Sequence, residues 1–458
     1  MTPQLALYSS LLTVYYVFSM MKVALISFGC AKNLVDSEVM LGHLRKSGYT
    51  LISDPEEADV IIVNTCGFIK PAKDESREAL RKFVSVKANA QEKKVIAAGC
   101  FVERYRDTLE KQFPEVDSWI GVGDFDKIVQ AIEEKQFEKS EACFLYDHTS
   151  PRLVSTPPGW AYVKISEGCS HECSFCAIPL IKGPYCSRPI PSILKEVELL
   201  ASSGVKEVNL ISQDTTYFGR DRGEKDGLVP LLRELLAIKG IEWVRILYGY
   251  PEEITDPLLE ILQEKKICSY LDLPFQHSDP QLLKLMKRGM EGTRALKLIE
   301  KIRTKVPGVA LRTAIIVGFP GETKSKFNAL KRLCKNARFN HLGVFTYSQE
   351  DGTSSFSLGE TVAEMEKMRR KEEIMEMQTE ISYSHNRNFL NKCLEVLIEG
   401  TLKEDPKVLV GRTQFQAPEV DGVVFIPFDE DISEVVNTIQ KVEIVECDVY
   451  DLHGKLIQ

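Results

Sequence analysis

The sequence predicts an α/β protein with three domains in series. Two stretches, about residues 23–140 and 160–348, alternate short β-branched runs with amphipathic segments, which predicts parallel sheets covered by helices. A third stretch, residues 392–458, holds short strands separated by turn residues, which predicts a small β-barrel. The chain has 458 residues, 44% of them hydrophobic, so each domain can form its own core.

The first domain is predicted to be doubly wound. Its strands are expected at residues 23–28, 60–65 and 94–99, and its helices at 37–47, 73–87 and 103–113. Cys30, Cys66 and Cys100 follow these three strands, each beside a glycine. Because the carboxyl ends of parallel strands share one edge of a sheet, we expect the three thiols to converge. Cysteine is also a common small core residue, but three in the same topological position favour ligands.

The second domain is predicted to be a full or partial (βα) barrel that follows a linker at residues 150–159. Its strands are expected at residues 162–166, 207–212, 243–248, 269–275, 309–319 and 341–348, with helices such as 193–202, 228–238 and 280–287 between them. Active sites of such barrels lie at the carboxyl ends of the strands. The stretch EGCSHECSFC, with Cys169, Cys173 and Cys176, begins at the end of the first strand, so the sequence predicts a catalytic mouth there.

The C-terminal part is predicted to be a charged helix followed by a five-stranded barrel of the oligonucleotide-binding kind. The helix is expected at residues 362–391 and the strands at 394–400, 407–413, 422–428, 441–450 and 454–458.

Composition and charge narrow the class of protein. Twelve cysteines are too sparse for a disulfide scaffold, and residues 5–19, although apolar, lack a basic region before them and a cleavage site after them. This segment is also short for a transmembrane helix. We therefore expect residues 1–21 to be a non-essential extension, the thiols to be reduced and the protein to be cytoplasmic. The net charge of -8 argues against a general nucleic-acid binder.

Three cysteines in one short loop indicate a particular kind of metal site. A structural zinc ion needs four ligands, and no second Cys-x-x-Cys pair or histidine follows at zinc spacing. His171 lies inside the loop, and we expect it to face solvent. A four-iron cluster on three thiolates leaves one iron free to bind a substrate or cofactor.

The cysteine loop resembles the signature of the radical S-adenosylmethionine (SAM) enzymes. The matching features are Cys169, Cys173 and Cys176 at their spacing, with aromatic Phe175 just before the last cysteine. The resemblance implies that the open iron binds the amino and carboxylate groups of SAM. One electron then cleaves the sulfonium to a deoxyadenosyl radical, while the protein orients the cofactor and excludes water.

Over residues 22–458 the chain resembles the methylthiotransferases, and within them the branch that modifies an aspartate of a ribosomal protein. The motifs that carry this likeness are GCAKNLVDSE, KISEGC, ISQDTTYFGRD, YPEEITD, YLDLPFQH, FPGET and RTQFQAPEVDG. The resemblance implies a methylthiotransferase domain at residues 22–145, a radical SAM barrel at 155–385 and a TRAM barrel at 386–458.

The same resemblance implies the cofactors and partners. Two 4Fe-4S clusters are expected, one on Cys30, Cys66 and Cys100 that delivers sulfur and one on the cysteines of the loop. One SAM would supply the methyl group and a second the radical, which takes hydrogen from the β-carbon of an aspartate in small-subunit ribosomal protein twelve. A reductant protein such as flavodoxin or ferredoxin is expected, with no membrane partner and a monomeric chain.

Further residues at strand ends are weaker candidates. We expect Phe175, Gln213, Asp214 and Gly318 to contact SAM, with a strand-end cap as the alternative for Gln213 and Asp214 and a tight turn for Gly318. Gln276 and His277 also end a strand, and His277 is interpreted either as a core histidine or as a substrate contact. The remaining cysteines are predicted spectators: Cys143, Cys186, Cys268, Cys334, Cys393 and Cys447.

Two other functions fit parts of the pattern. One is the methylthiotransferase that modifies transfer RNA, and the other is a non-catalytic iron-sulfur or zinc protein that binds nucleic acid through the terminal barrel. Residues 385–458 hold seven Lys and Arg against fourteen Asp and Glu, a net charge of -7. An RNA-binding groove needs positive charge, whereas an acidic domain attracts a basic ribosomal protein. We therefore expect carboxylates such as Asp429, Glu430 and Asp431 to contact the protein substrate.

Overall fold

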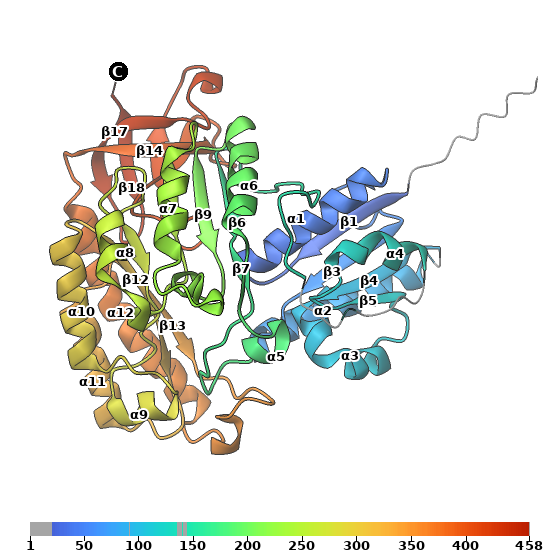
Figure 1. Ribbon diagram of the computed structural model, residues 1–458, viewed down its shortest axis with the longest axis horizontal. Helices are drawn as coiled ribbons and strands as arrows, with labels where there is room; N and C mark the ends of the chain where they lie inside the picture. Colours follow the sequence, from blue (N-terminus) through green and yellow to red (C-terminus); the bar gives the residue numbers. More distant parts are fainter. Residues whose placement is uncertain (1–20, 91, 135–139, 141–143, 458) are drawn as a thin grey trace, which may run out of the picture.

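The computed structural model describes residues 21–90, 92–134, 140 and 144–457, which form three units in chain order (Figure 1). Residues 1–20 of the predicted extension, and Cys143 among the predicted spectators, lie outside the described residues. Over the part that is described, the structure contains no helix with the length and apolar character needed to cross a membrane.

The first unit is a five-stranded parallel sheet between helices, as predicted. Its strand order is β2-β1-β3-β4-β5. The strands are β1 (Lys22–Ser27), β2 (Thr50–Leu51), β3 (Val60–Thr65), β4 (Lys94–Gly99) and β5 (Ser118–Ile120). The helices are α1 (Ala31–Lys46), α2 (Lys70–Ala88), α3 (Cys100–Gln112), the 3-10 turn η1 (Phe125–Lys127) and α4 (Ile128–Glu133). Strands β2 and β5, only two and three residues long, were not predicted.

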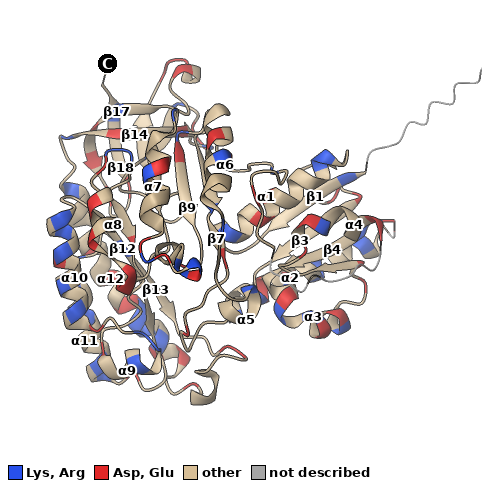
Figure 2. Ribbon diagram, viewed as in Figure 1, with Lys and Arg blue, Asp and Glu red and all other residues tan. Residues whose placement is uncertain are grey.

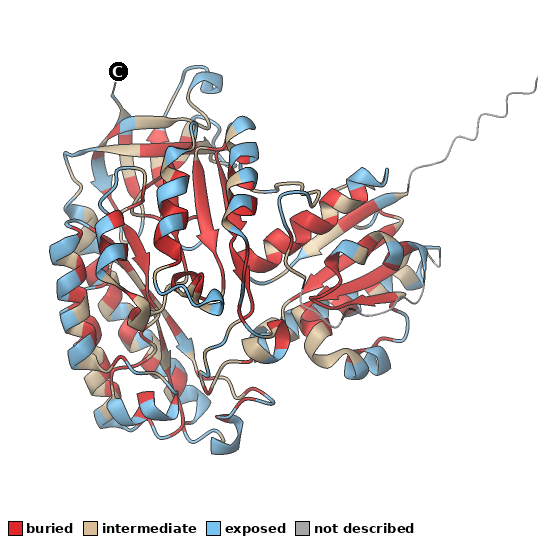
Figure 3. Ribbon diagram, viewed as in Figure 1, coloured by how far each residue is buried: buried red, intermediate tan, exposed pale blue. Residues whose placement is uncertain are grey.

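Helix α1 begins six residues earlier than the predicted residue 37. Its first turns bury polar as well as apolar side chains, because the helix is covered by the sheet on one side and by the barrel strand β6 (Trp160–Lys164) on the other. A helix that is buried on several faces has no amphipathic period for a sequence pattern to detect. Figure 3 shows the buried strands of this unit and the buried face of α1 toward the barrel.

The second unit is a partial barrel of six parallel strands. Two three-stranded sheets, β10-β9-β6 and β11-β12-β13, meet where Val244 bridges to Ile267. The strands are β6, β9 (Glu207–Ile211), β10 (Trp243–Ile246), β11 (Tyr270–Asp272), β12 (Ala310–Val317) and β13 (His341–Thr346), with the short pair β7 (Ser166–Glu167) and β8 (Cys186–Ser187) beside them. The predicted fold class is confirmed, with the barrel in its partial form.

Helices cover the outer face of this barrel. They are α6 (Ile190–Ser202), α7 (Leu228–Ala237), α8 (Asp256–Ile261), α9 (Pro280–Leu285), α10 (Gly292–Lys305), α11 (Lys324–Ala337) and α12 (Glu364–Arg387). The short helix α5 (Ile178–Lys182), which follows the cysteine loop, packs instead on α3 of the first unit. Short 3-10 turns lie at η2 (Thr215–Tyr217), η3 (Arg220–Arg222), η4 (Pro251–Glu253) and η5 (Phe356–Leu358). Helix α12 is shorter at both ends than predicted. Figure 2 shows Lys and Arg positions gathered along α10 and α11.

The third unit is a closed barrel of five strands, as predicted. The strand order is β14-β15-β16-β18-β17. Its elements are β14 (Cys393–Thr401), β15 (Val408–Thr413), β16 (Val424–Pro427), the turn η6 (Ile432–Glu434), β17 (Ile439–Cys447) and β18 (Leu452–Leu456).

The small barrel docks on the amino ends of the large barrel's strands. Glu207, the first residue of β9, forms a buried ion pair of 2.6 Å with Arg412 and one of 2.8 Å with Arg245. Arg245 also donates to the backbone oxygen of Gln414, and His341 at the start of β13 contacts the backbone oxygen of Phe415. The loop between β15 and β16 therefore lies against the end of the barrel opposite to the cysteine loop.

Replacing Glu207 by alanine should destabilise this docking strongly. The change leaves Arg245 buried without a carboxylate and Arg412 with Glu399 as its remaining carboxylate, which costs about 3–5 kcal/mol of unfolding free energy. Urea unfolding followed by the fluorescence of Trp160 and Trp243, which are both buried at this end of the barrel, measures the loss.

The matched control is Glu443→Ala, which removes one partner of the exposed pair between Glu443 and Lys455 on the small barrel. That loss should stay below about 1 kcal/mol. Equal effects of the two substitutions would contradict the docking described here.

Candidate iron-sulfur centres

The first cysteine triad lies at the carboxyl edge of the N-terminal sheet. Cys30 is the N-cap residue of α1, Cys66 follows β3 directly, and Cys100 is the first residue of α3 after β4. The three strands are adjacent in the order β1-β3-β4, so the structure brings the three residues together as predicted. The amino ends of α1 and α3, and with them the positive ends of two helix dipoles, lie at this edge beside Cys30 and Cys100.

A close contact of Gly29 shows how tightly these loops approach one another. Gly29 has a φ of +98°, and a Cβ there would lie 3.0 Å from Cβ and 3.1 Å from Sγ of Cys66. A larger residue at position 29 would push the Cys66 sulfur aside, and the left-handed backbone would also be strained. Glycine beside Cys30 is therefore a steric requirement for the convergence of the triad.

The thiols of this triad interact electrostatically. Burial and, to a smaller extent, the charge on Cys30 raise the pKa of Cys66 to about 11. Burial also raises the pKa of Cys100 well above its ordinary value, and Cys30 and Cys66 add to the effect. Each thiolate therefore disfavours the others unless a positive group such as a cluster iron compensates them.

The second triad lies in the loop after β7, at the mouth of the barrel. The amide of Cys169 donates to the oxygen of Gly183, and the amide of Cys176 donates to the oxygen of Cys173. The amide of Ser174 donates to the oxygen of Met286, beyond α9. These bonds fix the loop to two neighbouring parts of the barrel and direct it along the carboxyl edge.

Aromatic and charged side chains hold the same loop. The His171 ring stacks on Tyr250 with 3.9 Å between ring centroids, and its Nε2 lies 2.6 Å from Asp214 Oδ2. The Arg288 guanidinium lies 3.8 Å from the centroid of the Tyr250 ring, and its Nη1 donates to Cys173 Sγ over 3.7 Å. The prediction that His171 faces solvent is wrong, because its ring packs against the barrel mouth and pairs with a carboxylate.

The donor set fits four-iron clusters. Within the described ranges, no group of three or more His, Cys, Asp or Glu side chains converges tightly enough to hold a single metal ion. In a four-iron cluster each thiolate binds a different iron, so three neighbouring thiols without a fourth ligand suit a cluster better than a zinc ion.

Cluster loading on the metal-free chain should increase with pH. Burial raises the pKa of Cys169 to about 11 and of Cys176 to about 12, so these thiols carry protons near neutrality. Iron binds the thiolate, so each new iron-sulfur bond displaces a proton and becomes more favourable at higher pH. At limiting iron and sulfide, bound iron should increase from about pH 7 to about pH 9, with release of protons to an indicator dye. Loading that falls over this range would contradict the assignment of these thiols as ligands.

The predicted SAM contacts lie around the mouth, and their role stays a prediction. Phe175 packs on the buried cluster that includes Phe319. Gln213 donates to Glu167 over 2.6 Å, and its own buried amide oxygen has no hydrogen-bond partner among the described residues. Asp214 accepts from the amides of Thr216 and Tyr217 and so acts as the cap of η2.

Gly318 directly follows β12, where its φ is +77° and a Cβ would lie 2.3 Å from Cγ of Lys367. The amide of Gly318 donates to Glu322, which also pairs with Arg370 of α12. The GFPGE turn is therefore covered by α12. His277 is a core histidine, fully buried between Glu322 and the amide of Asp279.

Among the described residues, four of the predicted spectator cysteines lie in parts of the fold away from the two triads, whereas Cys186 lies on β8, next to the strand that precedes the cysteine loop. Cys268, Cys334 and Cys447 are buried and belong to apolar clusters, whereas Cys186 and Cys393 are exposed. Gln276, half-buried with a φ of 67°, bridges to Ile315 of β12.

The sequence reasoning missed a buried ion network between the two domains. Asp36 of α1 accepts from Lys164 of β6 and lies 3.0 Å from Lys182 of α5, and both lysines also pair with Glu167. All four side chains are at least 97% buried. Their residues lie in the quoted motifs or next to the cysteine loop, but nothing in a single sequence pairs residues more than a hundred positions apart.

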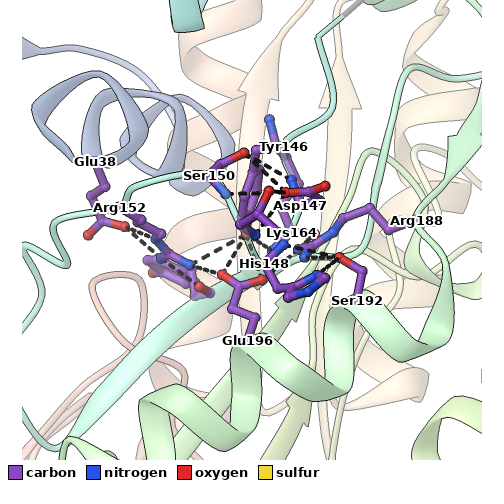
Figure 4. Close-up of polar contacts among 12 residues, drawn as sticks. Glu38, Tyr146, Asp147, His148, Ser150, Arg152, Lys164, Arg188, Ser192 and Glu196 are labelled. Atoms are coloured by element: carbon purple, nitrogen blue, oxygen red, sulfur yellow. Dashed lines mark hydrogen bonds and ion pairs between the residues drawn. The ribbon is translucent and has the colours of Figure 1, made fainter. Parts of the chain in front are cut away.

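A second network lies beside it (Figure 4). Arg152 of the linker pairs with Glu38 of α1 over 2.6 Å and with Glu196 of α6 over 2.5 Å. Glu196 also pairs with Arg188, whose guanidinium lies 4.3 Å from the centroid of the Tyr146 ring. Two carboxylates of α1, the helix that starts at Cys30, are therefore fixed to the barrel.

The far side of the mouth carries a third bridge. Glu350, in the loop after β13, lies 2.7 Å from both Lys73 of α2 and Arg104 of α3. The ammonium of Lys32, two residues after Cys30, lies 3.1 Å from the centroid of the Tyr248 ring at the end of β10. The first triad is therefore held over the barrel mouth that carries the second triad.

Comparison with known proteins agrees with this division of the chain. Residues 22–121 match the uncharacterized protein family UPF0004, residues 163–334 the radical SAM superfamily and residues 392–457 the TRAM domain. The chain is 43% identical over 443 residues to the ribosomal protein uS12 methylthiotransferase RimO of Pelobacter propionicus, with 95% of this chain and 98% of the relative covered. The chain belongs to the ribosomal protein uS12 methylthiotransferase family.

A second relative and a solved structure agree with this family membership and with the fold. The uS12 methylthiotransferase RimO of Aquifex aeolicus is 45% identical over 436 residues, which cover 95% of this chain and 97% of the relative. Among solved structures, the radical SAM methyltransferase TsrM of Kitasatospora setae, with cobalamin and a [4Fe-4S] cluster bound, aligns with a TM-score of 0.54. That alignment covers 73% of this chain and 77% of TsrM at 15% identity, so it shows a shared fold. As a member of the uS12 methylthiotransferase family, the chain is a radical SAM enzyme that uses SAM and [4Fe-4S] clusters.

Proposed function

We propose that this chain joins a methylthio group to the β-carbon of an aspartate in ribosomal protein uS12. The observation that carries the proposal is the placement of two cysteine triads at facing edges of two domains, with α5 directly between them. Relatives that cover nearly the whole chain are named as ribosomal protein uS12 methylthiotransferases.

The residues of the chain have separate roles in this reaction. When bound, two four-iron clusters and SAM supply one-electron cleavage of the sulfonium, the methyl group and the sulfur. Cys169, Cys173 and Cys176 would hold one cluster, and as three ligands for four irons they would leave room for SAM to bind. Arg288 places a fixed positive charge beside Cys173. Cys30, Cys66 and Cys100 would hold the other cluster, and the Glu350 bridge joins α2 and α3 to the loop after β13 on the far side of the mouth.

We further propose the partners and domain limits that go with this reaction. Residues 22–145 form the sulfur-delivering domain, 155–385 the radical SAM barrel and 386–458 the TRAM barrel. A flavodoxin or ferredoxin supplies the electron, the chain acts as a monomer, and the protein is cytoplasmic because its substrate is a ribosomal protein.

The acidic TRAM barrel is proposed to attract basic uS12. Asp429, Glu430 and Asp431 are exposed in the loop after β16, which projects from the molecule (Figures 1 and 2). The triple variant Asp429→Asn, Glu430→Gln, Asp431→Asn should raise KM for uS12 several-fold at low salt and leave kcat unchanged. The barrel docks far from the cysteine loop, so this surface contributes to encounter and not to the reacting geometry.

A matched control removes three exposed carboxylates elsewhere, through Glu372→Gln, Glu376→Gln and Glu380→Gln on α12. The control changes net charge equally and should have little effect on KM. If both triple variants shift KM alike, or if salt does not reduce the difference, the loop is not the docking surface.

Mass spectrometry of uS12 tests the proposed function in cells. In a strain without this gene, uS12 should lack the methylthio group on aspartate, and the gene should restore it. Unmodified transfer RNA together with normally modified uS12 in that strain would assign the chain to the transfer RNA reaction instead.

A further inference from the structure

Helix α5 connects the two cysteine triads physically. It begins two residues after Cys176, and Ala177 and Ile181 are buried in the apolar cluster of the first domain, against which Cys100 also packs. The helix packs on α3, whose first residue is Cys100. A segment of the barrel domain is therefore part of the core that surrounds the first triad.

The last residue of α5, Lys182, brings a buried charge into this core. Its side chain is 3% exposed, and Nζ lies 3.0 Å from Asp36 and 3.5 Å from Glu167. The ammonium also lies 5.5 Å from the centroid of the Phe125 ring, within the same apolar cluster. Solvent screens such a charge poorly, so its effect on neighbouring groups is large.

Buried charges near the first triad act on a cluster held there with opposite signs. Lys182 ends the helix that packs on α3 and shares an apolar core with Cys100, so its positive charge favours the added negative charge of a reduced cluster. Asp36 lies on α1, the helix that begins directly after Cys30, and its negative charge has the opposite effect.

We propose that Lys182, contributed by the barrel domain, raises the reduction potential of the cluster on Cys30, Cys66 and Cys100, and that Asp36 lowers it. The inference rests on the proposed function, because it requires a cluster on those cysteines. It makes the redox state of the sulfur-delivering cluster dependent on the docking of the two domains, since Lys182 belongs to one and the cysteines to the other.

The test uses the full chain with Cys173→Ala as background, so that only the first triad holds a cluster. After reconstitution the chain should hold about four irons. A redox titration followed by electron paramagnetic resonance then gives the midpoint potential. Lys182→Gln should shift it to more negative values, Lys182→Arg should leave it near the background value, and Asp36→Asn should shift it to more positive values.

Lys164→Gln is the matched control. Lys164 is a buried lysine of the same network, but it lies on β6, outside the apolar core shared by α5 and Cys100. Its loss should shift the potential less than the loss of Lys182. Equal shifts for the two lysines, or a negative shift for Asp36→Asn, would overturn the inference.

The outcomes remain decisive if one variant fails. If Lys182→Gln does not fold, the sign of the Asp36→Asn shift decides, measured on a chain whose iron content and absorption spectrum match those of the background, because water that enters a damaged site would also shift the potential. A background chain without iron would overturn the cluster assignment and the inference with it. Four irons with a potential that none of the substitutions moves would overturn the inference alone.

Discussion

Replacement of Cys66 by alanine is expected to abolish methylthio transfer while reductive cleavage of SAM continues. Cys66 lies in the first domain between Cys30 and Cys100, whereas the cysteines that bind the radical cluster belong to the barrel. The chain should lose about half of its roughly eight irons. Chromatography of the products should still show deoxyadenosine, with no methylthio group on uS12.

The control for Cys66→Ala is Cys393→Ala, which changes an exposed cysteine on the small barrel and should keep all irons and full activity. A folded Cys66→Ala chain with half its iron that releases no deoxyadenosine would refute the division of roles between the triads.

Replacement of Cys173 by alanine should abolish both deoxyadenosine release and methylthio transfer. Cys173 is the middle ligand of the barrel triad, and its sulfur is the one that Arg288 contacts. Without the third thiolate the radical cluster is lost, and no electron reaches SAM. Iron analysis and product chromatography measure both losses.

Cys186→Ala is the matched control for this loop. Cys186 on β8 pairs with Glu167 on β7, and Glu167 lies two residues before Cys169. The side chain of Cys186 is nevertheless exposed. The variant should keep iron and activity. Continued deoxyadenosine release by Cys173→Ala, or its loss in Cys186→Ala, would show that the ligands are assigned wrongly.

Much of the fold and both triads could be predicted because their signals are local. Cys30, Cys66 and Cys100 each follow a β-branched run, and parallel topology brings such strand ends to one edge. The second triad could be predicted from the short spacing of its three cysteines alone. The strands of the small barrel have clear turns between them, and the structure closes them into one barrel.

The remaining features depend on contacts between distant segments. The early start of α1 is hidden because the helix is buried by two domains, which removes its amphipathic period. The stacking of His171 on Tyr250 joins two loops about eighty residues apart. The pairing of Asp36 with Lys164 and Lys182 joins two domains. These features depend on tertiary packing. The local pattern of apolar and polar residues in the sequence carries no information about which distant segments pack together.

The most direct test of the central claim follows hydrogen from substrate to cofactor. The reconstituted chain is incubated with SAM, a reductant and uS12 whose aspartates carry deuterium at the β-carbon. We expect deuterium in the released deoxyadenosine and the mass of one methylthio group on a uS12 aspartate. Deoxyadenosine without deuterium and uS12 without added mass, while transfer RNA becomes methylthiolated under the same conditions, would contradict the account.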